Sequence, residues 1–175
     1  MFFDVRELEV RAGRFDVELG PGEVQFLDPK LRQTGPLRAA GKVELVSAAL
    51  EEIRVSGHIS VPMEADCDRC LEPAACSIDS DFELTYAPLA ATPVGEEVEL
   101  DPSEAEIGFY EGDGIELTDV LREYILLALP MQRVCSPDCK GICPVCGQSR
   151  NQKECVCHTD AVDDRWESLK KLVSE

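Results

Sequence analysis

Six of the nine cysteines in this 175-residue chain fall between Cys135 and His158, where the sequence reads CSPDCKGICPVCGQSRNQKECVCH. Two more form a Cys67-x-x-Cys70 pair far upstream, and Cys76 follows shortly after. Zn²⁺ prefers four tetrahedral thiolate or imidazole ligands, and a Cys-x-x-Cys turn brings two sulfurs to one metal. The cysteines therefore constrain how the chain can fold more than any other feature.

The last four cysteines can complete one metal site by themselves. A Cys-Pro-Val-Cys turn is followed by Gly147, and glycine lets the backbone turn back sharply after the second ligand. A Cys-x-Cys pair lies eight residues further on and is the natural other half. His158 could replace Cys157, although adjacent residues rarely both bind one metal. The expected ligands are Cys143, Cys146, Cys155 and Cys157.

The remaining two pairs have no local partners, so a second four-thiolate site requires that they combine. The expected ligands of this site are Cys67, Cys70, Cys135 and Cys139. Such a site would close a loop of roughly 65 residues and restrain the unfolded chain as a crosslink does. Metal binding would then supply folding free energy to the C-terminal third, which has little core of its own. We therefore predict two structural zinc ions, since CPxCG turns favour zinc over iron.

Period-two alternation predicts three antiparallel strands, over residues 37–48, 51–61 and 75–86, each with one face on the core. The Cys67-x-x-Cys70 pair lies in the connection before the third strand. Cys76 shares the apolar face of that strand, so we expect a structural role for it. His58 lies on the polar face and is expected to face solvent. Two early stretches, 15–19 and 24–26, are predicted as strands or an extended arm.

Two helices are predicted. The first covers residues 118–129, with Thr118 as N-cap and Asp119 favourably placed in the first turn. The extra leucines near its end imply that much of its last turns is buried, and Pro130 ends it. The second helix covers residues 163–173. Between strands and first helix, residues 87–115 form a long acidic insertion with short strand-like pieces at 97–100 and 106–110.

These elements predict an α+β chain. Residues 1–130 form a β-rich domain, an antiparallel sheet or partial barrel with the acidic insertion and one long helix. Residues 131–175 form a cysteine-rich zinc lobe with a short C-terminal helix, tied to the first domain by the shared metal site.

Charge and composition narrow the classes of function. The formal net charge is −18, and thirteen acids but no Lys or Arg lie between Asp79 and Asp119. Nucleic-acid binding needs a positive footprint, so any RNA contact must be local, in the weakly basic stretch 131–158. The acidic segment suits a basic protein partner better, or is simply a solvated loop. No signal peptide or transmembrane stretch is recognisable, and nine cysteines without one indicate a reducing compartment such as the cytoplasm.

An enzymatic role is not expected. Catalytic zinc keeps an open position for water, whereas eight cysteines in two closed sites leave none. No phosphate-binding loop, nucleophile elbow or dinucleotide motif is present, and we predict no small-molecule substrate. A zinc-thiolate redox sensor or a chaperone-like interaction module remains the alternative.

Four motifs together resemble the YceD family. They are CDRCLEP at 67–73, LLALP at 126–130, CSPDCKGICPVCGQSRNQKECVC at 135–157 and DDRWESLKKL at 163–172. The sequence departs from the family at 149–151, where an Asn-Leu-Asn run is usual, and at 163–165, where Asp-Pro-Arg is commoner. Neither departure touches an expected metal ligand.

The resemblance implies a role in accumulation of large-subunit (23S-type) ribosomal RNA, and therefore in building the large ribosomal subunit. It also implies association with a ribosomal protein, with the RNA, or with a precursor particle of the large subunit.

Overall fold

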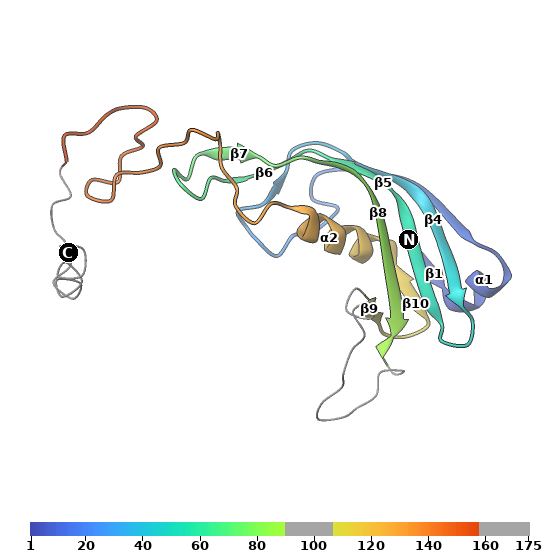
Figure 1. Ribbon diagram of the computed structural model, residues 1–175. Coiled ribbons are helices and arrows are strands. Elements are labelled where there is room, and N and C mark those ends of the chain that lie inside the picture. Colours follow the sequence, from blue (N-terminus) through green and yellow to red (C-terminus); the bar gives the residue numbers. More distant parts are fainter. Residues whose placement is uncertain (90–106, 158–175) are drawn as a thin grey trace, which may run out of the picture. The chain divides into compact units, whose positions relative to one another are not determined.

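The structure is a computed structural model that describes residues 1–89 and 107–157, and its architecture is α+β (Figure 1). The chain divides into two compact units, which the polypeptide enters and leaves more than once. The first unit comprises residues 1–65 and 75–131, and the second comprises residues 66–74 and 132–175. The turn that carries Cys67 and Cys70 therefore groups with the C-terminal segment rather than with the strands around it.

A five-stranded mixed sheet forms the centre of the first unit. Its strands lie in the order β2, β4, β5, β8 and β9, and every neighbouring pair is antiparallel except β8 with β9. The strands are β2 (Gly13–Leu19), β4 (Leu37–Ser47), β5 (Glu52–Val61), β8 (Ile78–Pro88) and β9 (Ile107–Tyr110). The alternation in the sequence correctly predicted the central meander β4–β5–β8 and the short strands β2 and β9.

The register of the meander places one set of residues on the core. Val43 lies opposite Val55, which in turn lies opposite Leu84, while Gly57 lies opposite Phe82. Both valines are fully buried, and Phe82 is buried beside them. The other face carries polar side chains, among them His58, which is exposed as expected and pairs with Asp81 and Asp79 of β8 at 2.9 and 3.2 Å.

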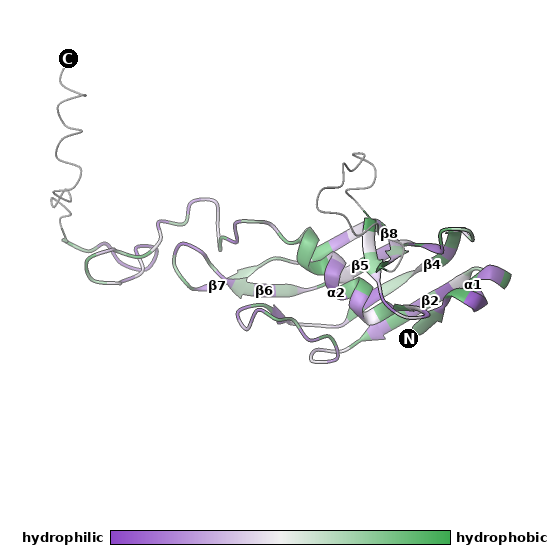
Figure 2. Ribbon diagram, turned by 90° about the horizontal axis from the view of Figure 1, so that it is seen from below, coloured by the Kyte–Doolittle hydropathy of each residue, from purple (hydrophilic) through white to green (hydrophobic). Residues whose placement is uncertain are grey.

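The helix α2 (Leu117–Ala128) lies across the core face of this sheet (Figure 1). Its apolar stripe joins the main core, and the ring of Tyr124 packs 5.0 Å from that of Phe82, centroid to centroid. The Tyr124 hydroxyl also donates to the carbonyl oxygen of Asp81 at 3.2 Å. Figure 2 shows the polar and apolar residues alternating along the helix and the strands. The buried residues of the helix are Leu117, Val120, Leu121 and Ile125.

Two expectations for this helix were wrong. The N-cap is Glu116 rather than Thr118, because strand β10 runs directly into the helix and leaves no loop for a hydroxyl cap. The last turns are not mostly buried, since Leu126 and Leu127 are 40 and 68% exposed and only one face is covered. The helix itself lies within one residue of the predicted range 118–129, and its 12 residues are an ordinary length, so the description of it as long is not confirmed. It does end before Pro130, and Leu129 takes the extended conformation that a following proline favours.

The N-terminal elements were not predicted in this form. Strand β1 (Phe2–Asp4) pairs antiparallel with β10 (Gly114–Glu116), and helix α1 (Val5–Val10) follows at once. Asp4 caps α1, accepting a hydrogen bond from the backbone N–H of Arg6 at 2.8 Å. Residues 24–26, expected as a strand or an extended arm, form no strand and follow a turn at residues 21–23, and Val24 is buried.

A three-stranded sheet joins β3 (Arg32–Gln33), β6 (Met63–Asp66) and β7 (Pro73–Ala75) in that order. Residues 132–157 contain turns and a single isolated bridge between Ile142 and Ser149. The second unit thus has very little hydrogen-bonded secondary structure in its described part. The predicted helix at 163–173 and the strand-like piece at 97–100 lie outside the described residues.

Candidate metal centres

The first cluster joins two cysteine pairs that are far apart in sequence. Cys67 and Cys70 lie in the turn between β6 and β7, and Cys135 and Cys139 lie in the segment after α2. The four sulfurs lie within 4.8 Å of one another. The sulfurs of Cys67 and Cys139 are 3.8 Å apart, and those of Cys70 and Cys135 are 3.5 Å apart. The structure therefore brings together the Cys67–Cys70 and Cys135–Cys139 pairs, which the sequence analysis had combined into one four-cysteine site.

The Cys67–Cys70 turn is closed by its own backbone. Leu71 N–H donates to the carbonyl of Cys67 at 2.9 Å, and Cys67 N–H donates to that of Glu72 at 2.8 Å. Leu71 takes a positive φ of 63°, unusual for leucine, to complete the turn. The backbone N–H groups of Arg69 and Cys135 both point at the Cys67 sulfur, each at 3.4 Å.

Further hydrogen bonds hold the two segments of the second unit together. Asp68 N–H donates to the Arg133 carbonyl at 2.8 Å, and Arg133 N–H donates to the Asp68 carboxylate at 2.7 Å. Arg69 donates from its guanidinium to the Cys139 carbonyl at 3.2 Å, and its own carbonyl accepts from Ile142 N–H at 3.0 Å. Hydrogen bonds on both sides of the sulfurs therefore hold the Cys67–Cys70 turn against the segment that follows α2.

The second cluster is local. The sulfurs of its four cysteines also lie within 4.8 Å of one another. Gly147 has a φ of +71°, and its N–H donates to the Cys143 carbonyl at 2.8 Å, which is the sharp turn expected after the CPVC sequence. His158 lies outside the described residues, so its substitution for Cys157 stays a hypothesis. The members of the cluster are Cys143, Cys146, Cys155 and Cys157.

The geometry of both clusters fits a tetrahedral metal. Four sulfurs about 2.3 Å from a zinc ion lie about 3.8 Å from one another, close to the separations in the first cluster. A disulfide would need sulfurs about 2.05 Å apart. Each cluster could therefore hold one metal ion, and neither would leave a coordination position open.

The thiols within each cluster differ strongly in acidity. Burial raises the pKa of Cys67, but the N–H groups directed at its sulfur outweigh this and lower the pKa to about 6. The Glu72 N–H lowers the pKa of Cys70, but burial and the neighbouring sulfurs raise it to about 12. In the second cluster, the N–H groups of Cys146 and Val145 lower the pKa of Cys143 to about 6. Each cluster thus contains one thiol, Cys67 or Cys143, whose thiolate is favoured at neutral pH, and a second, Cys70 or Cys157, whose pKa is raised to about 12; thiolate is the form that binds metal.

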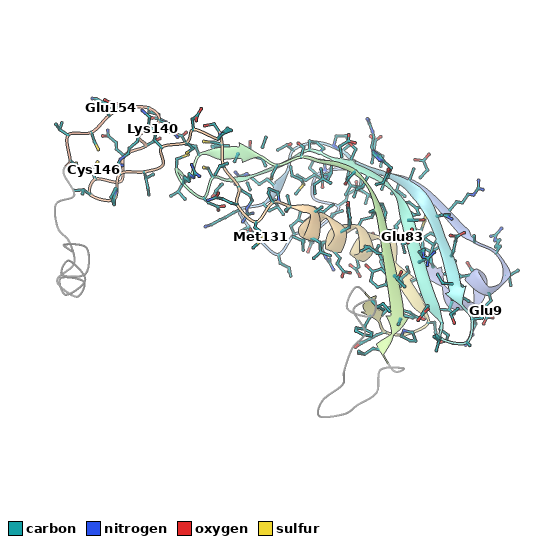
Figure 3. All side chains as sticks on the ribbon, viewed as in Figure 1. Glu9, Glu83, Met131, Lys140, Cys146 and Glu154 are labelled. Carbon is teal, nitrogen blue, oxygen red and sulfur yellow. The ribbon has the colours of Figure 1, made fainter. Side chains whose placement is uncertain are left out.

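The two clusters differ in exposure. In the first, Cys67, Cys70 and Cys139 are buried and Cys135 is exposed. In the second only Cys143 is buried, and Cys146 is exposed. Figure 3 labels Cys146 beside Lys140 and Glu154, whose side chains form an ion pair at 3.7 Å. The second cluster is therefore the more accessible to chelators and oxidants.

Two side chains near the sulfurs were not singled out from the sequence. Asn151 donates to the Cys139 sulfur at 3.3 Å, and this contact lowers the pKa of Cys139. Arg150 hydrogen-bonds the sulfur of Cys143, which raises the pKa of the guanidinium. Both lie in the connection between the two halves of the second cluster, where any polar residue was a candidate but no pattern distinguished these two.

The ninth cysteine takes no part in either cluster. Cys76 is buried in the main core of the first unit, as its place on the apolar face of the third predicted strand had indicated. Among the described residues, no helix is both long enough and apolar enough to cross a membrane.

The fold and the two clusters define an α+β protein with two sets of four cysteines, each of which could hold a metal ion. The chain belongs to the YceD family, described as large ribosomal RNA subunit accumulation protein YceD, whose sequence pattern matches residues 55–173. The resemblance read from the motifs is thereby confirmed.

Several curated proteins are similar to this chain. An uncharacterized protein of Mycobacterium tuberculosis is 32% identical over 75% of this chain, and the match covers 59% of that protein. The chain thus spans about three fifths of the length of this relative. The uncharacterized protein YlbN of Bacillus subtilis is 25% identical over 99% of this chain and 95% of its own length. No solved structure matches.

A plant relative carries a functional name. The "large ribosomal RNA subunit accumulation protein YCED homolog 1, chloroplastic" of maize is 28% identical over 60% of this chain and 44% of its own length.

Proposed function

We propose that this chain is a non-enzymatic factor that supports accumulation of large-subunit, 23S-type rRNA and assembly of the large ribosomal subunit. Membership of the YceD family carries this proposal, because maize and Arabidopsis relatives are named for accumulation of that RNA. Large-subunit assembly in a bacterial cell takes place in the cytoplasm, and we place the chain there.

The eight clustered cysteines hold two structural zinc ions in this proposal. Four thiolates per site, on CxxC-type turns, suit zinc better than magnesium, calcium or manganese. A site closed by four protein ligands stabilises a fold, whereas a catalytic zinc needs a place for water. The first site is made by Cys67, Cys70, Cys135 and Cys139, and the second by Cys143, Cys146, Cys155 and Cys157.

Charge favours a basic protein as the direct partner. The described residues of the first unit carry 19 acidic and nine basic side chains. Those of the second unit carry five of each, because Asp66, Asp68 and Glu72 offset the basic residues of the C-terminal segment. Two tetrathiolate zinc sites would add about four negative charges to the second unit. A basic ribosomal protein therefore suits either unit better than bare RNA, whose phosphates need a positive surface.

Depletion of the protein tests the proposal. Cells that lack it should show a reduced large-subunit peak on a density gradient and reduced 23S-type rRNA, and the wild-type chain should restore both. Cys67→Ser should restore them poorly, whereas Cys76→Ala, which removes a cysteine outside both clusters, should restore them well. Normal subunit peaks and rRNA levels after depletion would contradict the proposal.

Exposure of Cys146 keeps a zinc-thiolate redox sensor as the second candidate. Hydrogen peroxide would oxidise two thiolates of the second cluster to a disulfide, would itself be reduced to water, and zinc would leave. Reversible zinc release by less than one equivalent of peroxide favours the sensor. Clusters that keep their zinc under these conditions favour the structural role.

A further inference from the structure

Asn151 lies in the sequence between ligands of the second cluster, but its side chain contacts the first cluster. It lies between Cys146 and Cys155, and so within the loop that the second cluster closes. Its side-chain nitrogen nevertheless donates to the Cys139 sulfur of the first cluster at 3.3 Å, with the Cys135 sulfur at 4.0 Å. One side chain thus connects the two candidate metal centres.

The orientation of this side chain is fixed by a second hydrogen bond. The Asn151 oxygen accepts from the backbone N–H of Lys140 at 2.8 Å, so the nitrogen is directed at the sulfurs. Lys140 directly follows Cys139 in the chain. Asn151 therefore holds both the sulfur of a first-cluster ligand and the backbone next to it.

The segment that carries Asn151 is held by the second cluster. Arg150 N–H donates to the Gly141 carbonyl at 2.8 Å, and its guanidinium hydrogen-bonds the sulfurs of Cys143 and Cys155. Cys143 N–H donates to the Gln148 carbonyl, also at 2.8 Å. A metal that fixes the second-cluster sulfurs would therefore fix the backbone of residues 148–151, and with it the position of the Asn151 amide.

We propose that Asn151 couples the two clusters, so that metal binding in one strengthens metal binding in the other. The proposal rests on the assignment of both clusters as zinc sites. Hydrogen bonds to ligand atoms commonly change metal affinity by about 10- to 100-fold. The effect must be reciprocal, because coupling between two binding sites acts equally on each. In the singly loaded chain the Asn151 contact would be ordered less completely.

Zinc affinities of the reduced full-length chain, measured by chelator competition, test the coupling. The variant Cys146→Ser with Cys157→Ser keeps only the first site, and Cys67→Ser with Cys135→Ser keeps only the second. We expect the overall two-zinc association constant of the wild type to exceed the product of the two single-site constants by about 5- to 150-fold. The same three constants are then measured in chains that also carry Asn151→Asp, which keeps the acceptor oxygen but loses the donor. For these chains the ratio of the two-zinc constant to the product of the single-site constants should be near one.

Lys153→Ala is the matched control, because this neighbouring side chain is exposed and the variant should keep the wild-type ratio. Native mass spectrometry at one equivalent of zinc gives a readout that needs no cysteine variant. Wild type should contain a smaller fraction of the singly loaded chain than Asn151→Asp, because coupling favours the doubly loaded chain over the singly loaded one. Equal proportions of empty, singly and doubly loaded chain in wild type and Asn151→Asp would overturn the coupling while leaving the zinc sites intact. A wild-type ratio of association constants near one would do the same. A chain that binds no zinc would overturn the site assignment itself.

Discussion

The sulfur of Cys70 lies 3.5 Å from the sulfur of Cys135, although 65 positions separate the two residues in the chain. A metal ion shared by these cysteines closes a loop that contains strand β8 and helix α2. The first cluster can therefore affect the stability of the β-rich unit through chain connectivity alone, since closing a loop restricts the unfolded chain.

Loss of metal from the first cluster should lower the free energy of unfolding of the β-rich unit. For a crosslink that closes a loop of this length, the chain-entropy estimate is about 4 kcal/mol. Urea unfolding followed by circular dichroism should show this loss for Cys67→Ser. The variant Cys146→Ser opens only a short local loop and, in zinc excess that keeps the first cluster loaded, should leave the unfolding of the β-rich unit nearly unchanged. Equal effects of the two variants would contradict this role of the first cluster.

Two leucine-sized side chains of α2 should differ sharply in their contribution to stability. Ile125 is fully buried against the sheet, so Ile125→Ala should reduce the free energy of unfolding by about 2–5 kcal/mol. Leu127 is 68% exposed, and Leu127→Ala should change stability by no more than about 0.5 kcal/mol. Urea midpoints of the two variants make the comparison. A large loss at Leu127 would mean that the exposed face of α2 is covered in solution.

The histidine on the outer face of the sheet should titrate above its ordinary value. The hydrogen bond to Asp81 is the largest cause that raises the pKa of His58 above 6.5, and the charges of Asp79 and Asp81 add to it. Protonated His58 is thus favoured in the folded chain. Its contribution to stability is complete below pH 6.5, the unfolded value, and is lost as the pH rises through the folded pKa.

An NMR titration of the His58 ring protons measures this shift, and His158→Gln removes the only other histidine signal. Asp81→Asn should bring the pKa back toward 6.5, and Asp79→Asn should have a smaller effect. A pKa at or below 6.5 in the wild type would contradict the pairing seen in the sheet.

Several features were predictable from the sequence because they follow from local rules. The alternation of polar and apolar residues determines which residues of β4, β5 and β8 share a face of the sheet. The observed register pairs Val43 with Val55, so two apolar residues lie opposite each other on the core face. The cysteine pairs were predictable from valence, because two clusters of four can be built only if Cys67 and Cys70 join Cys135 and Cys139.

Other features depend on contacts between distant segments, which local patterns do not encode. Strand β10 forms because Phe2 pairs with Glu116, and this pairing also moves the start of α2 away from the expected Thr118 cap. Leu126 and Leu127 extend an apolar run, but a run does not tell which side the sheet covers. The contact of Asn151 with Cys139 forms only when both clusters are folded, so the sequence alone does not reveal it.

The zinc content of the purified chain, by elemental analysis, tests most directly whether distant cysteines share a metal. We predict two zinc ions per wild-type chain and two for Cys76→Ala, whose cysteine lies in the main core outside both clusters. Cys67→Ser should contain one, because it removes a ligand of the first cluster only. Two zinc ions in Cys67→Ser, or none in the wild type, would contradict a site shared by residues 67, 70, 135 and 139.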